Sequence, residues 1–339
     1  MLARPLLIAF TGLLSTSSPR SGVSSPPAPG VPPNIVLIVL DDVGLDKLNL
    51  YGSTPATGGG WNYTLGSGAV LTETLPAMPT LSWMASEGVR FRHAYSTPLC
   101  SPTRAQLLSG RYGHQTGMLH LTQTGTPSDC SGGFPLPHQS SPGVPIGLLP
   151  QVLKSAGHAT GAFGKWHLAG DGTDLDHPAK CGFDLFVGHM QNNEPTAGQA
   201  TPNHYSWTRV VKQRGQAATV HAETEFDARK TRTFARGFIE RQVAAHTPYF
   251  AYVAFNPPHA PFQPPPPETI MNSPTSTYAD IKALNGWSDA DYANKYKDTL
   301  ASPPTDCDTA TPAHFEARLY YRAQLEAIDW EIRQLLGTT

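Results

Sequence analysis

The sequence predicts an α/β protein with a mostly parallel central sheet flanked by helices. Two runs, residues 35–40 and 249–255, are apolar without alternation, as in strands that are buried on both faces of a parallel sheet. Residues 159–163 are predicted to form a further strand of the same sheet. Two long segments, 225–245 and 314–336, carry apolar residues at helical spacing and supply helices to cover the sheet. Strands that alternate with helices along the chain are typical of this fold class.

The chain is long enough for one large domain and for part of a second domain. The chain has 339 residues, of which 39% are hydrophobic, and this is enough to build a large core. The formal net charge is −2 and no run of basic residues occurs, so a nucleic-acid partner is not expected. Glycine and proline are abundant, at 31 and 33 residues, and they predict long connecting loops.

The N-terminal segment precedes the predicted domain, which spans residues 34–339. Arg4 is followed by an apolar run at residues 6–10 that is too short to cross a bilayer. Residues 1–18 are therefore predicted to be a signal peptide, and no transmembrane anchor is expected. Residues 19–33 form a Ser/Pro-rich linker. A signal peptide implies the secretory pathway and a secreted, lysosomal or periplasmic protein; a merely disordered tail is the alternative.

Two adjacent carboxylates, Asp41 and Asp42, directly follow the first predicted strand. In open α/β sheets, ligands bind at the carboxyl ends of the strands. Neighbouring carboxylates repel each other unless a cation lies between them, and oxygen ligands favour Ca²⁺, or alternatively Mg²⁺, over zinc. The alternative is a simple turn, since aspartate favours turns, but a turn rarely needs two of them.

A loop that leads into a helix carries the candidate nucleophile, Cys100. Pro102 suits the first helical position, and Gly110 can end the helix in a left-handed conformation. Cys100 then lies at the helix N-terminus, where free N–H groups favour an anion, and Arg104 lies close to the same face. The pattern predicts a nucleophile beside a site for a tetrahedral oxyanion. The alternative is a small buried cysteine and a surface arginine.

Basic side chains follow two of the predicted strands. Lys165 and His167 come after the strand at 159–163 and are two residues apart, so on an extended chain they point the same way. Together they suggest an anion site with an acid/base group. His259 lies among prolines after the strand at 249–255 and is rigidly aimed. The alternatives are solvent-facing polar residues and a structural histidine.

The other segments are assigned to short helices and loops. Helices are predicted at residues 80–86 and 148–156, each closely followed by a glycine. Residues 119–144 are irregular and proline-rich. Residues 192–222 and 271–312 are polar without periodicity, and each is predicted to be an insertion.

The segment around Cys100 resembles the sulfatase signature. Cys-x-Pro-x-Arg at 100–104 is followed by Ser-Gly-Arg at 109–111, and Gly-Lys-Trp-His at 164–167 looks like a later segment of the same family. The first pattern spans about a dozen residues, which is long for a chance match. The resemblance runs from about residue 34 to 336. It implies the alkaline phosphatase-like fold and the hydrolysis of an aryl or carbohydrate sulfate ester.

The resemblance also implies roles for individual residues. In the family, a formylglycine-generating enzyme oxidises the cysteine to formylglycine, an aldehyde whose hydrate is the nucleophile, and this implies formylglycine at Cys100. The family pattern also implies that Asp41, Asp42 and the modified Cys100 bind a divalent cation. It implies that Arg104, Lys165 and His167 take part in catalysis. It implies that Lys165 and His259 bind the sulfate.

Only the first part of a typical family member is covered. The family pattern continues with a strand that ends in an Asp-Asn pair, two further metal ligands, and with a second sulfate-binding lysine, but no Asp-Asn dipeptide occurs here. The C-terminal part of the domain is therefore expected to be missing, and the sheet edge beside residues 35–40 to be unpaired. A truncated or pseudo-sulfatase that binds sulfated ligands without turnover is the alternative function. A related phosphoesterase is disfavoured, because those enzymes usually place Ser or Thr at the nucleophile.

The other three cysteines, Cys130, Cys181 and Cys307, leave room for one disulfide in an oxidising compartment. Resemblance to the arylsulfatase B-like branch implies a bridge between Cys130 and Cys181, with Cys307 free. The same branch makes a sulfated sugar more expected than a small aryl ester. Asn62-Tyr63-Thr64 is a glycosylation sequon, which predicts a glycoprotein in a eukaryotic secretory pathway.

Overall fold

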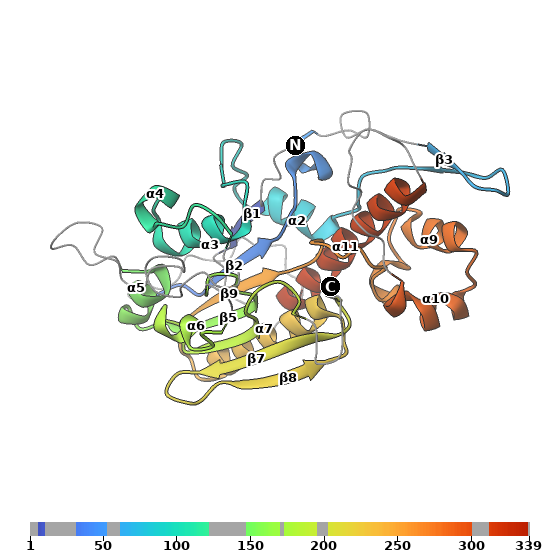
Figure 1. Cartoon of the computed structure of the whole chain (residues 1–339). Coiled ribbons are helices and arrows are strands. Elements are labelled where there is room, and N and C mark those ends of the chain that lie inside the picture. The colour runs from blue at the N-terminus through green and yellow to red at the C-terminus, as the bar shows by residue number, and fades with distance from the viewer. Residues whose placement is uncertain are drawn as a thin grey trace.

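The computed structural model of the chain describes residues 6–10, 32–52, 62–121, 147–169, 173–194, 203–299 and 312–337. Within these residues a sheet of seven strands has the order β1-β2-β9-β5-β6-β7-β8 (Figure 1). The four central strands run parallel, whereas β1, β7 and β8 each join their neighbour antiparallel. The bounds in sheet order are β1 Leu6–Phe10, β2 Ile35–Leu40, β9 Tyr249–Phe255, β5 Ala159–Lys165, β6 Leu185–His189, β7 Trp207–Gln213 and β8 Thr219–Glu223. The predicted α/β class is confirmed.

Helices cover both faces of the sheet. The first face carries α2 (Pro79–Glu87), α7 (Asp227–Ala244) and α11 (Pro312–Leu336), and the second carries α3 (Cys100–Ser109), α5 (Leu149–Ser155) and α6 (His177–Lys180). The shorter elements are α4 (Gly113–Thr116), α8 (Pro267–Ile270), α9 (Thr277–Asn285), α10 (Asp289–Lys295) and the hairpin of β3 (Asn62–Thr64) and β4 (Val70–Thr72).

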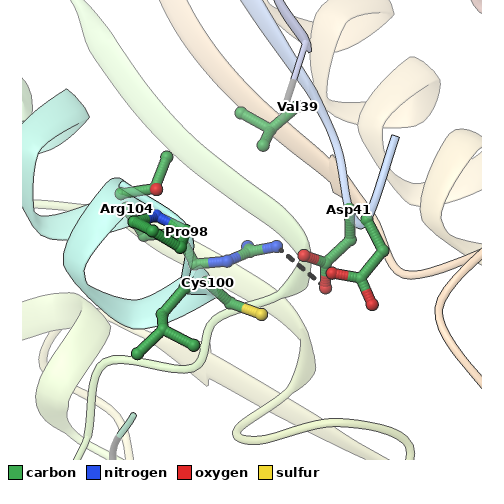
Figure 2. A pocket seen from close by; sticks show the side chains of 8 residues that line it. Val39, Asp41, Pro98, Cys100 and Arg104 are labelled. Carbon is green, nitrogen blue, oxygen red and sulfur yellow. Dashed lines mark ion pairs between the residues drawn. The ribbon is translucent and has the colours of Figure 1, made fainter. Parts of the chain in front are cut away.

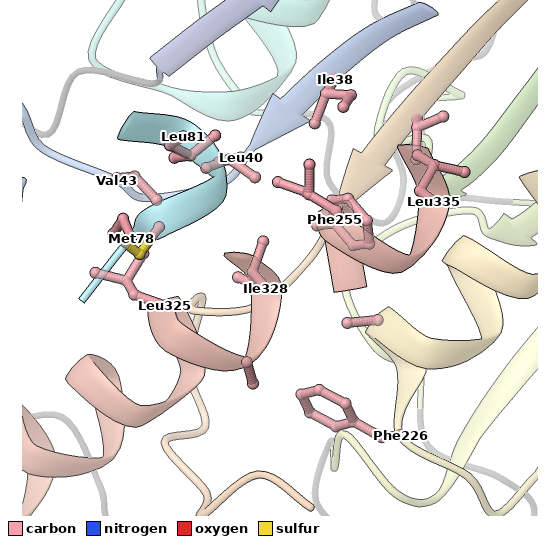
Figure 3. Close-up of a cluster of buried hydrophobic side chains, with 14 of the residues drawn as sticks. Ile38, Leu40, Val43, Met78, Leu81, Phe226, Phe255, Leu325, Ile328 and Leu335 are labelled. Carbon is pink, nitrogen blue, oxygen red and sulfur yellow. The ribbon is translucent and has the colours of Figure 1, made fainter. Parts of the chain in front are cut away.

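The core explains why β2 and β9 are apolar throughout. Ile38 and Leu40 face the first helical layer, together with Phe255, Leu81 and Leu325 (Figure 3). The alternate residues of the same strands face the second layer, which holds Leu37, Val39, Phe250, Tyr252, Ala105 and Leu108. Every second side chain is thus buried on each face, which removes the alternation that a half-exposed strand would show.

Residues 192–222, for which the sequence predicted no regular element, contain β7 and most of β8. β7 is only half-buried. β8 is an edge strand in which the side chains of residues 219–222 are exposed and that of Glu223 is buried. An exposed edge strand needs no apolar periodicity, so its sequence carried no strand pattern. The second predicted insertion contains α9 and α10, and α9 packs against α11.

The expectation of an unpaired edge beside residues 35–40 is wrong for this structure. β1 pairs antiparallel with β2 over its whole length, from Leu6 opposite Leu40 to Phe10 opposite Val36. The segment predicted to be the core of a signal peptide therefore forms the outer strand of the sheet. Cleavage at about residue 18 stays a prediction.

Candidate active site

The candidate residues gather at the carboxyl edge of the parallel strands. Asp41 follows β2, Lys165 ends β5, and His259 follows β9 by a short loop. Because β2, β9 and β5 are neighbours in the sheet, their carboxyl ends lie side by side. The N-terminus of α3 meets the same edge and brings Cys100 toward Asp41 (Figure 2).

The α3 helix positions Cys100 and Arg104. It begins at Cys100, two residues before the predicted start at Pro102, and Gly110 ends it in the left-handed region with φ of 66°. Arg104 is 1% exposed. Its guanidinium donates to the backbone oxygen of Lys165 at 2.6 Å, and Nη2 lies 3.5 Å from Asp41 Oδ2. The arginine is therefore a buried charge within the site, which excludes the surface alternative.

Lys165 and Asp41 form the central ion pair of the site. The Lys165 ammonium donates to Asp41 Oδ2, and both side chains are buried. The same Nζ lies 3.8 Å from Cys100 Sγ. Burial disfavours the Asp41 carboxylate, but the charges of Lys165 and Arg104 outweigh it and hold the pKa of Asp41 well below its usual range.

The Cys100 thiol is a poor nucleophile in this setting. Burial, followed by the nearby Asp41 carboxylate, raises its pKa to about 11, and the Lys165 ammonium only partly opposes this shift. The attacking species in cysteine chemistry is the thiolate, which is scarce at neutral pH when the pKa is so high. The geometry therefore does not favour a cysteine-thiolate mechanism.

His259 lies beside the second aspartate. Its Nδ1 is 2.8 Å from the Ala260 carbonyl oxygen, so Nδ1 carries a proton, and Nε2 is 3.7 Å from Asp42 Oδ2. Burial and the Lys165 ammonium lower the pKa of His259, against the opposing effect of the two aspartates. His259 also contributes to a cluster with Asp41 and Cys100 whose ligand atoms all lie within 4.8 Å of one another.

The residues present fit a divalent cation. Burial and repulsion by Asp41 raise the pKa of Asp42, so the two carboxylates hold negative charge at close quarters that a cation would relieve. Carboxylate oxygens suit Ca²⁺ or Mg²⁺, whereas a thiol suits softer metals. Replacing the thiol of Cys100 by an oxygen would therefore make the cluster a better site for a hard cation.

His167 departs from the predicted extended geometry. The strand ends at Lys165, and His167 has φ of 53°, so the two-residue spacing does not place these side chains on one face of a strand. The backbone N–H of His167 donates to the Met190 carbonyl at 2.8 Å, and its Nδ1 is buried with no hydrogen-bond partner among the described residues. Burial and the Lys165 ammonium lower the pKa of His167 well below its ordinary value, which keeps the ring neutral and able to accept a proton.

The cavity at the nucleophile is narrow. It measures about 10 Å³ and is lined by Val39, Asp41, Asp42, Pro98, Leu99, Cys100, Thr103 and Arg104 (Figure 2). This is about the room that one water molecule needs.

The sequence analysis missed several buried polar residues at the same edge. Asn256 directly follows β9 and is 1% exposed, with no hydrogen-bond partner for either side-chain polar atom among the described residues. His189 ends β6, and Glu194 follows in the next loop; each has one buried atom without such a partner. The rule that ligands bind at the carboxyl ends of strands could have singled out Asn256, because it follows an obvious strand.

The predicted disulfide is not formed. Cys181 is a free thiol with 0% exposure, packed in the second core layer with its sulfur 3.5 Å from His177 Nδ1. Cys130 and Cys307 lie outside the described residues. The prediction is wrong because Cys181 lies at the end of α6 and faces the core, not a loop at the surface.

No helix in the described part of the chain is long and apolar enough to cross a membrane.

Comparison with known proteins gives one consistent result. Residues 33–338 match the family model described as "Sulfatase". The N-acetylgalactosamine-6-sulfatase of Sus scrofa is 34% identical over 261 residues, which are 74% of this chain and 43% of that protein. The steryl-sulfatase of Mus musculus is 33% identical over 207 residues, covering 58% of this chain and 29% of that protein. The chain thus spans less than half the length of these relatives.

A solved structure supports the same fold. A protein crystallised with its substrate, D-glucosamine-2-N,6-O-disulfate, aligns with a TM-score of 0.51 and 18% identity, over 90% of this chain and 61% of that one.

Proposed function

The chain belongs to the sulfatase family, and from that premise we propose that it carries the nucleophile and part of the sulfate-binding site of a sulfuric ester hydrolase. One observation carries the proposal: Arg104, Lys165 and Asp41 converge on Cys100 at the carboxyl edge of the sheet. Two buried cations beside a candidate nucleophile suit an ester of an anionic acid such as sulfate, whose oxygens they would bind.

The nucleophile is formylglycine made from Cys100 by a formylglycine-generating enzyme. A thiol with a pKa of about 11 does little chemistry at neutral pH, so the cysteine serves better as the precursor of another group. When formed, the hydrated aldehyde supplies a nucleophilic oxygen, and a divalent cation held by Asp41 and Asp42 supplies positive charge that lowers the pKa of that oxygen.

The chain's own residues bind the sulfate and move a proton. Arg104 and Lys165 neutralise charge on the sulfate oxygens, and their buried positions strengthen this effect by excluding water. His259 binds a sulfate oxygen when its Nε2 also carries a proton, because its Nδ1–H is already bonded to the Ala260 carbonyl. His167 remains neutral because burial lowers its pKa, and it takes the proton whose loss releases sulfate from the enzyme.

The substrate is a sulfate ester of a carbohydrate. The N-acetylgalactosamine-6-sulfatase relative and the structure with a sulfated glucosamine are named for sugar sulfates, whereas the steryl-sulfatase relative is not. The cavity beside Cys100 has no room for a sugar ring, so residues outside it select the sugar. The narrower assignment to an arylsulfatase B-like branch stays a prediction, as does a secreted, lysosomal or periplasmic location.

A second function, binding of sulfated ligands without turnover, is favoured by one observation. Asp41 and Asp42 are the carboxylates at the cation site among the described residues, and the 339 residues contain no Asp-Asn dipeptide that would add two further oxygen ligands. Mass spectrometry of the Cys100 peptide after co-expression with a formylglycine-generating enzyme separates the two functions. The aldehyde is expected at Cys100 and absent from Cys100→Ala; a thiol that persists in the wild-type peptide would favour the binding protein.

A further inference from the structure

His204 lies outside the site but connects with it through buried hydrogen bonds. Its side chain is fully buried, and it comes from the stretch before β7 that carries no sequence pattern. Its backbone N–H donates to Gln263 Oε1 at 2.7 Å, and its backbone oxygen accepts from the N–H of Asp227 at 3.0 Å. The main chain of His204 is therefore fixed between the loop after β9 and the start of α7.

The imidazole of His204 spans the same two elements. Its Nδ1 lies 2.8 Å from the side-chain amide nitrogen of Asn193 and 3.1 Å from Asp227 Oδ2, and its Nε2 lies 3.0 Å from the backbone oxygen of His259. A carbonyl oxygen only accepts, so Nε2 must carry a proton and donate. Asp227 is 1% exposed, and its carboxylate holds the other side of the ring. A buried carboxylate and a buried imidazole in contact form a rigid support for whatever the ring's far side touches.

The neighbouring residues strengthen this support. The hydroxyl of Tyr205 donates to the Pro264 carbonyl at 2.8 Å, and the side-chain amide of Gln263 donates to the Lys297 carbonyl at 2.9 Å. The loop that carries His259 is thus tied to residues 204–205 at both of its ends.

The orientation of the His259 ring depends on that loop. The ring is bonded to the adjacent Ala260 carbonyl through Nδ1, so it turns with the local backbone. Its Nε2 faces Asp42 at 3.7 Å. A displacement of the His259 carbonyl would therefore move Nε2 relative to Asp42 and the cation cluster.

We propose that His204, held by Asp227, is the positioning residue for His259: it donates a hydrogen bond to the His259 carbonyl and fixes the imidazole in the direction in which it meets a sulfate oxygen. The role of His259 toward sulfate rests on the proposed function. The support of His259 by His204 does not.

The test is NMR of the histidine ring nitrogens in the full 339-residue chain, with inorganic sulfate as the probe. The His259 signals are identified by their loss in His259→Gln. His204→Gln retains a side-chain N–H that can reach the His259 carbonyl, whereas His204→Leu has none. The matched control is His158→Leu. His158 is also buried and bonds two carbonyls, those of Leu153 and Pro33, but it precedes β5 at the opposite edge of the sheet.

In the wild type, His259 is expected to show a proton fixed on Nδ1 and a shift when sulfate is added. His204→Leu should average the His259 tautomers and weaken the sulfate response by about fivefold or more, as for a lost hydrogen bond. His204→Gln and His158→Leu should retain the wild-type pattern. The positioning role is overturned if His204→Leu leaves the His259 signals unchanged. It is also overturned if His158→Leu or His204→Gln alters these signals as much as His204→Leu does.

The two proposals fail in different ways. A fixed His259 ring that does not respond to sulfate in any variant contradicts the sulfate contact and supports the positioning role. If His204→Leu does not fold, the His259 signals of His204→Gln are compared with those of the wild type. Loss of the fixed His259 tautomer in His204→Gln then overturns the role of His204.

Discussion

The ammonium of Lys165 is bonded to the carboxylate of Asp41 and also lies 3.8 Å from the sulfur of Cys100. One cation therefore connects the end of β5, the end of β2 and the start of α3. Both side chains of the ion pair are buried, so each is a strong electrostatic influence on the other and on the thiol between them.

Lys165→Met should destabilise the fold by about 3 kcal/mol at pH 7, because it leaves the Asp41 carboxylate buried with Arg104 as its remaining cationic partner. The measurement is urea unfolding. Lys154→Met is the control: it removes the partly exposed ion pair with Asp184 and should cost less than about 1 kcal/mol.

The pH dependence of that loss has a defined sign. Because the folded-state pKa of Asp41 is lowered, the ion pair stabilises the fold above the ordinary aspartate pKa, and the stabilisation is lost as the pH falls. The difference between wild type and Lys165→Met should thus shrink in acid. A difference that is constant from pH 7 to acid would contradict the assigned charges.

Cys100 should react slowly with iodoacetamide despite its partial exposure. A pKa of about 11 in place of the usual 9.0 lowers the thiolate fraction, and with it the alkylation rate at pH 8, by about 100-fold. The rate is measured in a Cys130→Ser, Cys307→Ser background, and a short cysteine peptide serves as the reference. Alkylation as fast as that of the peptide would show that the thiol is not buried beside Asp41.

Cys181 gives an internal check in the same experiment. It is fully buried, so it should remain unlabelled until the protein unfolds. Non-reducing peptide mapping of the wild type should also recover Cys181 as a free thiol. A mapped Cys130–Cys181 bridge would contradict the structure.

Glu194 should make the fold less stable as the pH rises from about 4.5 to about 7. Burial raises its pKa from 4.5 to about 7, and its Oε2 has no hydrogen-bond partner within the described ranges. The folded state thus favours the protonated acid, and ionisation costs about 3 kcal/mol at most. Glu194→Gln should remove this part of the pH dependence in thermal unfolding from pH 4 to 8, whereas the exposed Glu240→Gln should not. Identical pH profiles for wild type and Glu194→Gln would refute the assignment.

Asp329 on α11 serves as the cap of another helix. Its two carboxylate oxygens accept from the backbone N–H groups of Thr80 and Leu81, both at 2.9 Å, in the first turn of α2. Asp329→Ala leaves both donors without a partner and should lower the free energy of unfolding by about 2 kcal/mol. Asp329→Asn retains one acceptor and should lose less; equal losses for the two variants would argue against capping.

Calcium binding by residues 1–339 should be weak. Asp41 and Asp42 are the two carboxylates at the site, whereas Ca²⁺ takes about six to eight oxygens. Calorimetry with Ca²⁺ should show low affinity, reduced further in Asp42→Asn, and 4-nitrocatechol sulfate should not be hydrolysed. Metal-dependent turnover at ordinary enzyme rates would mean that other residues of this chain complete the site.

The central strands and most of the site could be predicted because their signals are local. Fully apolar β2 and β9 are recognisable as buried strands, and residues such as Asp41 and His259 follow them in sequence. The rule for ligand position in α/β sheets then brings these residues together without any knowledge of side-chain contacts.

The remaining features depend on tertiary structure. β8 is exposed along most of its length, so its sequence needs no apolar period. The left-handed backbone of His167 is imposed by its surroundings, since a non-glycine residue rarely adopts it unaided. Three polar residues contribute to the site or its support because they are buried: His204, Asp227 and Asn256. Burial of a single polar side chain leaves no periodic pattern in a sequence.

Because β1 pairs with β2, the chain before signal-peptide cleavage and the chain after it would differ at one edge of the sheet. If residues 1–18 are removed on export, as predicted, the outer strand leaves with them and the backbone groups of β2 that faced it must find water or another strand. The precursor would then have β2 paired on both sides, and the mature chain would be prone to associate through β2. The order of cleavage and folding, set by the export machinery, would decide which of the two forms accumulates.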